Sequence, residues 1–380
     1  MLEQQSHYAL KQAISNQVEE DIRVLDNLRC EVRPLRGSLR RIQPRSTTAI
    51  SLVGTDGGNN RIQFDPFLVQ LVRVVDSSNN EYCLEAITPT TDVTELGRAQ
   101  FLPEGQPRTP LGHMLAYLGL RDLPKLSHMI RRNDRGEPTS SSWVQVYREL
   151  MEWAVLFSIL RNKDFATDTI IVCDGLLRSK VFAADNFVTL RRGFQEAIEH
   201  QWKQNRRRIY LVGVAKHSKV LDRYRLALAL ERVLTSEYPA YVPVPRELEE
   251  QAYVWSEYAR GDDRVIEGGE INRYVAGKMF FVKFGSGPRD PIWPIDIFIP
   301  QEADAQTVLG YLLADATDGF PIPFYPRCLQ KAHENASLVD FDFDVLQDEV
   351  FSAIRNALGN QSDQLDEFQL RDSDPSQRRY

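Results

Sequence analysis

No apolar run in this 380-residue sequence approaches the roughly 18 residues needed to cross a bilayer, so no membrane-spanning helix is predicted. Residues 1–21 are polar and acidic and lack the apolar centre of a signal peptide. Cysteine is also scarce, with four residues and no CxxC pair, which argues against a zinc ribbon and a disulfide framework. We therefore expect a soluble, cytoplasmic protein with free cysteines.

The chain also lacks a net positive charge: 46 Lys and Arg stand against 53 Asp and Glu, giving −7. Two arginine clusters interrupt this acidic average, and their members are Arg29, Arg33, Arg36, Arg40, Arg41 and Arg45, and Arg206, Arg207 and Arg208. Because local clusters decide where nucleic acid binds, the net charge does not exclude it. Residues 361–380 are polar and charge-rich, which predicts a disordered tail.

The spacing of apolar residues predicts an α/β fold. Helical spacing marks four segments: 5–30, 142–161, 187–204 and 219–235. Short apolar runs of strand type mark five others: 48–53, 65–75, 81–88, 169–173 and 209–214. Three successive strands followed by alternating helices and strands are typical of a ribonuclease H-like core, with a mixed sheet flanked by helices.

Further elements are expected on both sides of this core. Strands are predicted near 278–285 and 293–299, and helices near 305–316, 326–338 and 343–358. Residues 89–141 are rich in Pro, Gly, Arg and Ser, so we expect an irregular insertion there with a short helix. We expect one elaborated domain over 46–360, preceded by a helical and basic segment over 1–45.

Two Asp-Gly pairs follow predicted strands and are the first candidates for chemistry. Asp56-Gly57 comes after the strand 48–53, and Asp174-Gly175 follows the strand 169–173. Ligands of open α/β sheets collect at the carboxyl ends of strands, and neighbouring strands lie about 4.8 Å apart. Two carboxylates that close favour a divalent cation such as Mg²⁺ or Mn²⁺. The alternative, that each pair only marks a turn, stays open on the residues alone.

The helix 142–161 carries two glutamates, Glu149 and Glu152, three positions apart on one broad face. Glu152 is surrounded in sequence by apolar residues, where an unpaired charge is expensive to bury. It must therefore reach solvent, pair with a base or bind a cation, and we prefer it as a third acidic ligand. Both glutamates could instead be solvated or bridge Arg148 or Arg161.

A late cluster, YPRCLQKAH at 325–333, combines a helix start at Pro326 with His333 beside an apolar face. A lone histidine in that setting is more often an ordinary surface or core residue than a ligand. Lys216 follows the strand 209–214 and could hold a phosphate, and it could equally be a lysine near a helix cap without a function.

Together, these motifs resemble the NurA nuclease family. Five elements match in order and with similar spacing. They are Thr55-Asp56-Gly57-Gly58 after a strand, a long helix with Glu152, Val172-Cys173-Asp174-Gly175-Leu176-Leu177 at a second strand, Val214-Ala215-Lys216 at a third strand, and the YPxxLxxAH pattern at 325–333. The resemblance covers about residues 48–338. The chain departs from the family at Gly58 and Leu176, where serine is common, and neither change removes a candidate ligand.

The resemblance implies a ribonuclease H-like, Mn²⁺- or Mg²⁺-dependent deoxyribonuclease that cuts single strands and degrades duplexes from 5′ ends in end resection and repair. It also implies a homodimer that works with the hexameric DNA translocase HerA. The implied metal ligands and catalytic residues are Asp56, Glu152, Asp174 and His333. The predicted substrate contacts are Lys216, Tyr325 and Arg178.

Two other functions fit parts of the sequence. In an actin-like or sugar-kinase-like phosphotransferase, a hairpin at 54–58 would hold ATP phosphates, but the bulky Leu-Leu-Arg after the second Asp-Gly argues against it. In a non-catalytic scaffold, the chain would bind DNA or a translocase without cutting, but all four candidate ligands are present.

The apolar stripe of the helix 5–30 needs a cover, which a dimer mate, a HerA-type translocase or the chain's own domain would provide.

Overall fold

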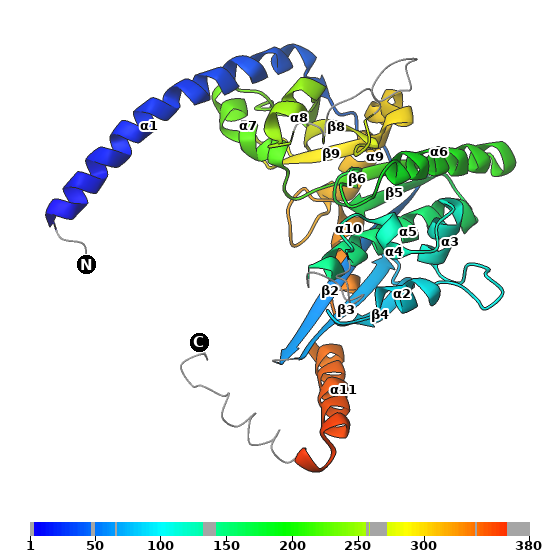
Figure 1. The fold of residues 1–380 in the computed structure, drawn as a ribbon. Coiled ribbons are helices and arrows are strands. Elements are labelled where there is room, and N and C mark those ends of the chain that lie inside the picture. Colours follow the sequence, from blue (N-terminus) through cyan, green and yellow to red (C-terminus); the bar gives the residue numbers. More distant parts are fainter. Residues whose placement is uncertain are drawn as a thin grey trace.

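The computed structural model describes residues 4–46, 50–64, 67–131, 142–255, 258, 272–338 and 340–362. They form an α/β fold in which helices cover a mixed sheet (Figure 1). Along the chain, one long helix precedes the first strand and further helices follow the last strand. The predicted fold class is thereby confirmed. Most of the predicted tail 361–380, the end of the predicted insertion 89–141 and the start of the predicted strand 48–53 lie outside the described residues.

Among the described residues, nine strands make one sheet in the order β1-β7-β8-β9-β6-β5-β2-β3-β4. Their bounds are β1 Arg40–Arg41, β2 Ser51–Phe64, β3 Phe67–Asp76, β4 Glu81–Ile87, β5 Thr169–Asp174, β6 Ile209–Val214, β7 Ala240–Pro243, β8 Gly277–Lys283 and β9 Ile292–Phe298. Strands β2, β5 and β6 are parallel, whereas β3 pairs antiparallel with both β2 and β4. This half of the sheet is the arrangement of three antiparallel and then parallel strands that the sequence predicts.

Helices pack on both faces of the sheet (Figure 1). Their bounds are α1 Gln4–Val32, α2 Val93–Arg98, α3 Pro110–Tyr117, α4 Leu123–Leu126, α5 Trp143–Asn162, α6 Asn186–Asn205, α7 Lys219–Leu230, α8 Arg246–Ala252, α9 Ala305–Thr317, α10 Arg327–Ala336 and α11 Asp340–Leu358. Strand β5 shows the reason, because Ile171 joins the core with α5 and α6 while Ile170 and Val172 join the core with α9 and α10. A strand that is apolar on both faces needs a cover on both.

The predicted glycine turn after the first strand is wrong, since β2 continues through it to Phe64. A Cβ at Gly54 would lie 2.4 Å from the carbonyl oxygen of Cys328, and one at Gly58 would lie 2.3 Å from that of Ala336. These glycines let α10 approach the strand rather than turning the chain. Asp56 consequently lies within β2 instead of after it, and no open phosphate-binding hairpin forms there, which argues against the phosphotransferase.

Other differences from the sequence predictions are local. The insertion 89–141 was expected to hold one short helix, and its described part holds α2, α3 and α4. Strands β1 and β7 and helix α8 were not predicted, because the two strands have only two and four residues and α8 is a mostly polar helix of seven residues. Helix α7 ends at Leu230 instead of about 235, where Arg232 and Leu234 adopt left-handed φ angles of 51° and 61°.

The first part of α1 projects away from the sheet (Figure 1). Its apolar side chains Ile14, Val18 and Ile22 are 52%, 55% and 48% exposed, respectively. From Leu25 and Leu28 onward the helix packs on the core that includes α7. Within the described residues, none of the helices, α1 included, combines the length and apolar character that spanning a membrane requires.

A buried carboxylate holds the second part of α1 and the segment after it. Glu231 Oε1 accepts a hydrogen bond of 2.8 Å from Arg29, and its Oε2 accepts one of 3.0 Å from Arg33. Hydrogen bonding from Arg33 and then from Arg29 lowers the pKa of Glu231 to about 2. Arg36 donates to the Glu231 carbonyl. These arginines of the predicted basic segment thus anchor the chain, and their contribution to DNA affinity stays a prediction.

Candidate metal centre

Asp56, Asp174 and His333 meet at one point of the sheet. Each offers one ligand atom, and these atoms all lie within 4.8 Å of one another. The Nδ1 of His333 lies 2.8 Å from the Oδ2 of Asp56. The two carboxylate side chains are 10% and 18% exposed, whereas His333 is 59% exposed. The trio is therefore buried on its acidic side and open on its imidazole side.

Strand pairing explains why the two aspartates meet. Thr55 of β2 pairs with Cys173 of parallel β5, so the next residue on each strand is an aspartate in the same register. Helix α10 brings His333 to them, because Leu329, Ala332 and Ala336 are buried and the helix packs on β2. Although the position of Asp56 within β2 differs from the prediction, the predicted meeting of these three residues is found.

The surroundings of Asp56 disfavour its negative charge. Burial raises the pKa of Asp56, and the negative charge of Asp174 raises it further, while the hydrogen bond with His333 lowers it. A divalent cation would relieve this repulsion. Two carboxylate oxygens and an imidazole nitrogen are a donor set that suits Mn²⁺ or Mg²⁺, so the residues fit the predicted ion.

Glu152 approaches the trio from α5, on the other side of β2. A Cβ at Gly57 would lie 2.2 Å from Glu152 Oε1, so the missing side chain at Gly57 makes room for this carboxylate. Glu152 is 28% exposed and pairs with Arg148 at 3.3 Å. Burial raises its pKa to about 8, and the charge of Asp56 contributes in the same direction. Glu152 thus lies within electrostatic reach of the trio without being part of it.

Glu149, the alternative to Glu152, has another partner. Its Oε1 accepts a hydrogen bond of 2.5 Å from the hydroxyl of Ser179. Burial raises the pKa of Glu149, and the Ser179 hydrogen bond opposes that shift. Glu149 and Glu152 both line a cavity of about 260 Å³ that also contains Asp56 and Asp174. The choice between the two glutamates stays a prediction, and the pairing of Glu149 with Ser179 favours Glu152.

Two of the predicted substrate contacts instead touch Asp174. The Tyr325 hydroxyl donates to Asp174 Oδ1 at 3.0 Å, and Lys216 Nζ lies 3.1 Å from Asp174 Oδ2. Burial and the charge of Asp174 raise the pKa of Tyr325, so this phenol stays protonated and keeps donating. Lys216 Nζ also lies 5.4 Å from the centre of the Tyr325 ring. Both residues thus fix the orientation of Asp174, and their contact with a substrate stays a prediction.

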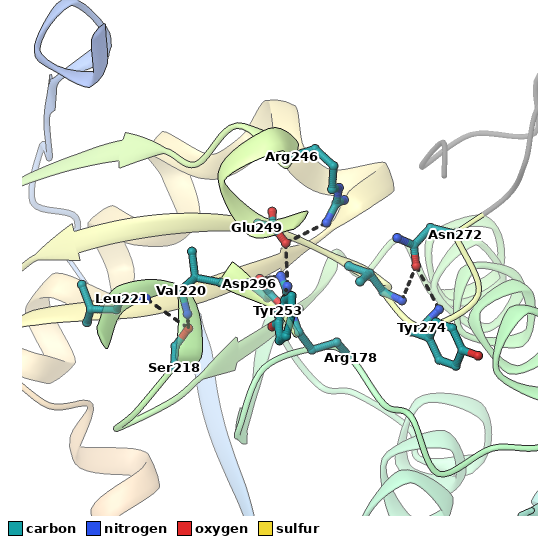
Figure 2. Close-up of polar contacts among 11 residues, drawn as sticks. Arg178, Ser218, Val220, Leu221, Arg246, Glu249, Tyr253, Asn272, Tyr274 and Asp296 are labelled. Atoms are coloured by element: carbon teal, nitrogen blue, oxygen red, sulfur yellow. Dashed lines mark hydrogen bonds and ion pairs between the residues drawn. The ribbon is translucent and has the colours of Figure 1, made fainter. Parts of the chain in front are cut away.

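Arg178, the third predicted substrate contact, is held by two buried carboxylates (Figure 2). Its Nε and Nη2 donate to Asp296 at 2.8 and 2.7 Å, and its Nη1 donates to Glu249 at 2.6 Å. Asp296 and Glu249 are both fully buried, and Arg246 shares Glu249 at 2.8 Å. This network joins the loop after β5 to β9 and α8. A direct contact of Arg178 with substrate stays a prediction.

Sequence reasoning missed a basic cavity beside Lys216. The cavity has a volume of about 1050 Å³ and one acidic residue, Asp290, in its lining. Its basic lining residues are Lys216, His217, Arg225, Arg232 and Arg289. They come from three separate segments, so no cluster is visible in the sequence. Arg206 and Arg208, which do cluster in the sequence, do not line this cavity and lie over the ring of Trp202.

Neither a protein-family model nor a curated protein matches the sequence. Among solved structures, the chain is similar to the NurA nuclease from Sulfolobus solfataricus, with a TM-score of 0.44 and 13% identity over 94% of this chain and 99% of that one. It is similar to NurA with manganese, with a TM-score of 0.39 and 12% identity over 92% of this chain and 98% of that one. It is also similar to NurA bound to dAMP and manganese, with a TM-score of 0.38 and 14% identity over 87% of this chain and 94% of that one. These structures belong to the family that the sequence motifs resemble.

Proposed function

We propose that this chain is a divalent-metal-dependent deoxyribonuclease of the NurA type. The observation that carries the proposal is the meeting of Asp56, Asp174 and His333 within 4.8 Å, with Glu152 facing them across the gap at Gly57. Acidic residues on neighbouring strands with a histidine beside them are suited to holding a cation against a phosphate group. The family resemblance of the motifs around these residues points to DNA as the substrate.

In this proposal Asp56, Asp174 and His333 hold Mn²⁺ or Mg²⁺, and Glu152 completes the set. A cation held by these residues would supply an activated water for attack on phosphorus and positive charge against the phosphate oxygens. Tyr325 and Lys216 hold Asp174 in place, each at one of its two carboxylate oxygens. His333 lies on the open side, where it binds the ion or carries a proton.

The basic cavity beside Lys216 supports a nucleic-acid substrate. Lysine and arginine side chains bind phosphates, and this electrostatic attraction supplies most of the sequence-independent affinity for DNA. Because Lys216 belongs to this cavity and also contacts Asp174, the cavity adjoins the metal centre. A DNA backbone in the cavity would pass beside the carboxylates that hold the ion.

The test of the proposal is cleavage of a linear single-stranded DNA by the purified full chain. We expect cleavage with Mn²⁺ or Mg²⁺ and none with EDTA. Asp56→Ala and Asp174→Ala should each abolish cleavage while the circular dichroism spectrum stays that of the wild type, because each removes a ligand and not a core side chain. A folded variant that keeps near-wild-type activity would refute the assignment, and a wild-type chain that only binds DNA would favour the scaffold.

The exposed part of α1 fits the partners that the resemblance implies. A stripe that includes Ile14, Val18 and Ile22 lies outside the chain's own core, so a homodimer mate or a HerA-type hexameric translocase would cover it. In this role the protein would act in DNA end resection and repair, with the translocase feeding DNA to the active sites.

We expect removal of residues 1–22, before the packed part of α1 begins, to convert a dimer into a monomer in light scattering. A full-length chain with Ile14, Val18 and Ile22 changed to serine is the matched control, because it removes the stripe and keeps the segment. We expect both changes to weaken binding to a HerA-type translocase. A truncated chain that stays dimeric and still binds the translocase would contradict this role.

A further inference from the structure

A second cavity, of about 430 Å³, lies beside the one that contains the carboxylates. Glu149 and Arg178 line both cavities, so the two adjoin. Its other lining side chains come mainly from the chain after β5 and from the segment after α8. We call this cavity the aromatic pocket, after Tyr253, Trp255, Tyr258 and Tyr274, which line it.

The aromatic side chains form a connected group. The rings of Tyr253 and Tyr258 have centroids 6.4 Å apart and meet edge to face, as do those of Tyr258 and Tyr274 at 5.2 Å. Asn272, which is fully buried, accepts hydrogen bonds of 2.9 Å from the backbone N–H groups of Tyr274 and the next residue (Figure 2). These contacts fix the position of Tyr274 at the pocket.

Trp255 is the exposed member of the group. Its side chain is 60% exposed, and the neighbouring Val254 is 92% exposed. An aromatic side chain offers a large apolar ring face, and covering that face with a stacked partner removes apolar surface from water. The pocket thus offers a flat, uncovered indole next to a group of tyrosine rings.

Two lysines give the aromatic pocket positive charge. Lys180 Nζ lies 5.7 Å from the centre of the Tyr258 ring, and Lys219 lines the pocket from the first residue of α7. Both lysines are exposed. Aromatic rings with lysines between them are the composition of sites that bind single-stranded nucleic acid, in which bases stack on the rings and phosphates contact the cations.

We propose that the aromatic pocket binds an unpaired base of a DNA strand whose backbone runs to the adjoining metal centre. This inference rests on the proposed nuclease function and adds to it the residues that hold one base of the substrate next to the metal centre. Trp255 stacks on the base, and Lys180 and Lys219 contact the flanking phosphates. Bases in a duplex are already stacked on their neighbours, so the pocket selects strands that are unpaired next to the cleavage point.

The test measures binding without cleavage. A fluorescein-labelled single-stranded oligothymidylate is titrated with the full chain in EDTA, and fluorescence anisotropy reports the dissociation constant. Stacking on one aromatic side chain contributes about 1–3 kcal/mol, so we expect Trp255→Ala to weaken binding roughly 5- to 150-fold. We expect Trp255→Phe to keep most of the affinity, because phenylalanine still presents a ring face.

Two controls separate base stacking from other effects. Leu84→Ala removes an exposed apolar side chain, 48% exposed on β4 at one end of the sheet, and should leave the affinity within about twofold of the wild type. An oligomer of abasic sites has the same phosphates without bases. If Trp255 stacks on a base, the wild type should bind this oligomer no better than Trp255→Ala does.

The outcomes distinguish the pocket from the nuclease proposal. Equal affinity of the wild type and Trp255→Ala for oligothymidylate would overturn the inference, even if the wild type cleaves DNA with Mn²⁺. The inference would also be overturned if Trp255→Ala lost as much affinity for the abasic oligomer as for oligothymidylate. Trp255 would then contact the backbone and not a base. A Trp255-dependent affinity in a chain that never cleaves DNA would support the pocket and refute the nuclease.

Discussion

His333 Nδ1 lies 2.8 Å from Asp56 Oδ2, although 277 positions separate these residues in the chain. The contact depends on α10 packing along β2, and Gly54 and Gly58 permit that packing because their missing side chains would overlap the helix backbone. The metal centre is therefore complete only when one of the last helices joins the first long strand.

We expect Glu152→Gln to reduce Mn²⁺-dependent cleavage far more than Glu149→Gln does. Glu152 faces the trio across Gly57, whereas Glu149 is hydrogen-bonded to Ser179. Single-turnover cleavage rates of the two variants, which are matched in chemistry and lie on the same helix, measure the difference. We expect a loss of at least about 100-fold for Glu152→Gln and less than about tenfold for Glu149→Gln. The reverse ranking would assign the ligand to Glu149.

The metal-free protein should lose stability as the pH rises from about 5 to about 8. The pKa of Glu152 is raised from 4.5 to about 8 in the fold, chiefly by burial, so the folded state holds more protons than the unfolded state between these values. Stability decreases with pH wherever the folded state binds more protons. Burial raises the pKa of Asp56 as well, which adds to this dependence at its lower end.

Glu152→Gln isolates the contribution of one carboxyl to this pH dependence. In EDTA, we expect its Tm at pH 8 to exceed that of the wild type by about 2 °C or more, and the difference to shrink towards pH 5. Thermal unfolding followed by circular dichroism at several pH values measures both. Parallel curves for the wild type and the variant would show that Glu152 does not carry the shift.

Gly54→Ala should destabilise the fold, because its Cβ would lie 2.4 Å from the carbonyl oxygen of Cys328. Backbone atoms cannot rotate away, so α10 must shift, and overpacking of this kind costs about 1–3 kcal/mol. Gly37→Ala is the matched control, since no atom lies within 4 Å of a Cβ there. Urea denaturation measures both variants, and equal stabilities would mean that α10 is not packed on β2 as described.

Much of this fold could be predicted because its elements have strong periodic patterns. The apolar spacing of α5 and the unbroken apolar runs of β5 and β6 identify them without tertiary information. Strand β7 and helix α8 are too short for such a pattern, and they form because the neighbouring strand and the buried ion pairs of Glu249 hold them. The extension of β2 was missed because glycine usually signals a turn and here permits a close helix.

The candidate site was likewise predictable only in part. Asp56 and Asp174 could be placed together from their positions beside adjacent strands, whereas the sequence alone gave no reason to prefer a functional His333, and only the family resemblance did. The roles of Lys216 and Tyr325 at Asp174, the basic cavity and the aromatic pocket all depend on contacts between distant segments. Such contacts leave no spacing in the sequence.

The central claim is that Asp56, Asp174 and His333 hold a divalent cation, and Mn²⁺ binding measures it without any assay of activity. The signal of free Mn²⁺ in electron paramagnetic resonance is recorded during titration of the full chain and of Asp56→Asn and Asp174→Asn. We expect the wild type to bind Mn²⁺, and each variant, folded by circular dichroism, to bind it at least about tenfold more weakly. Equal Mn²⁺ binding by the wild type and both variants would contradict the account.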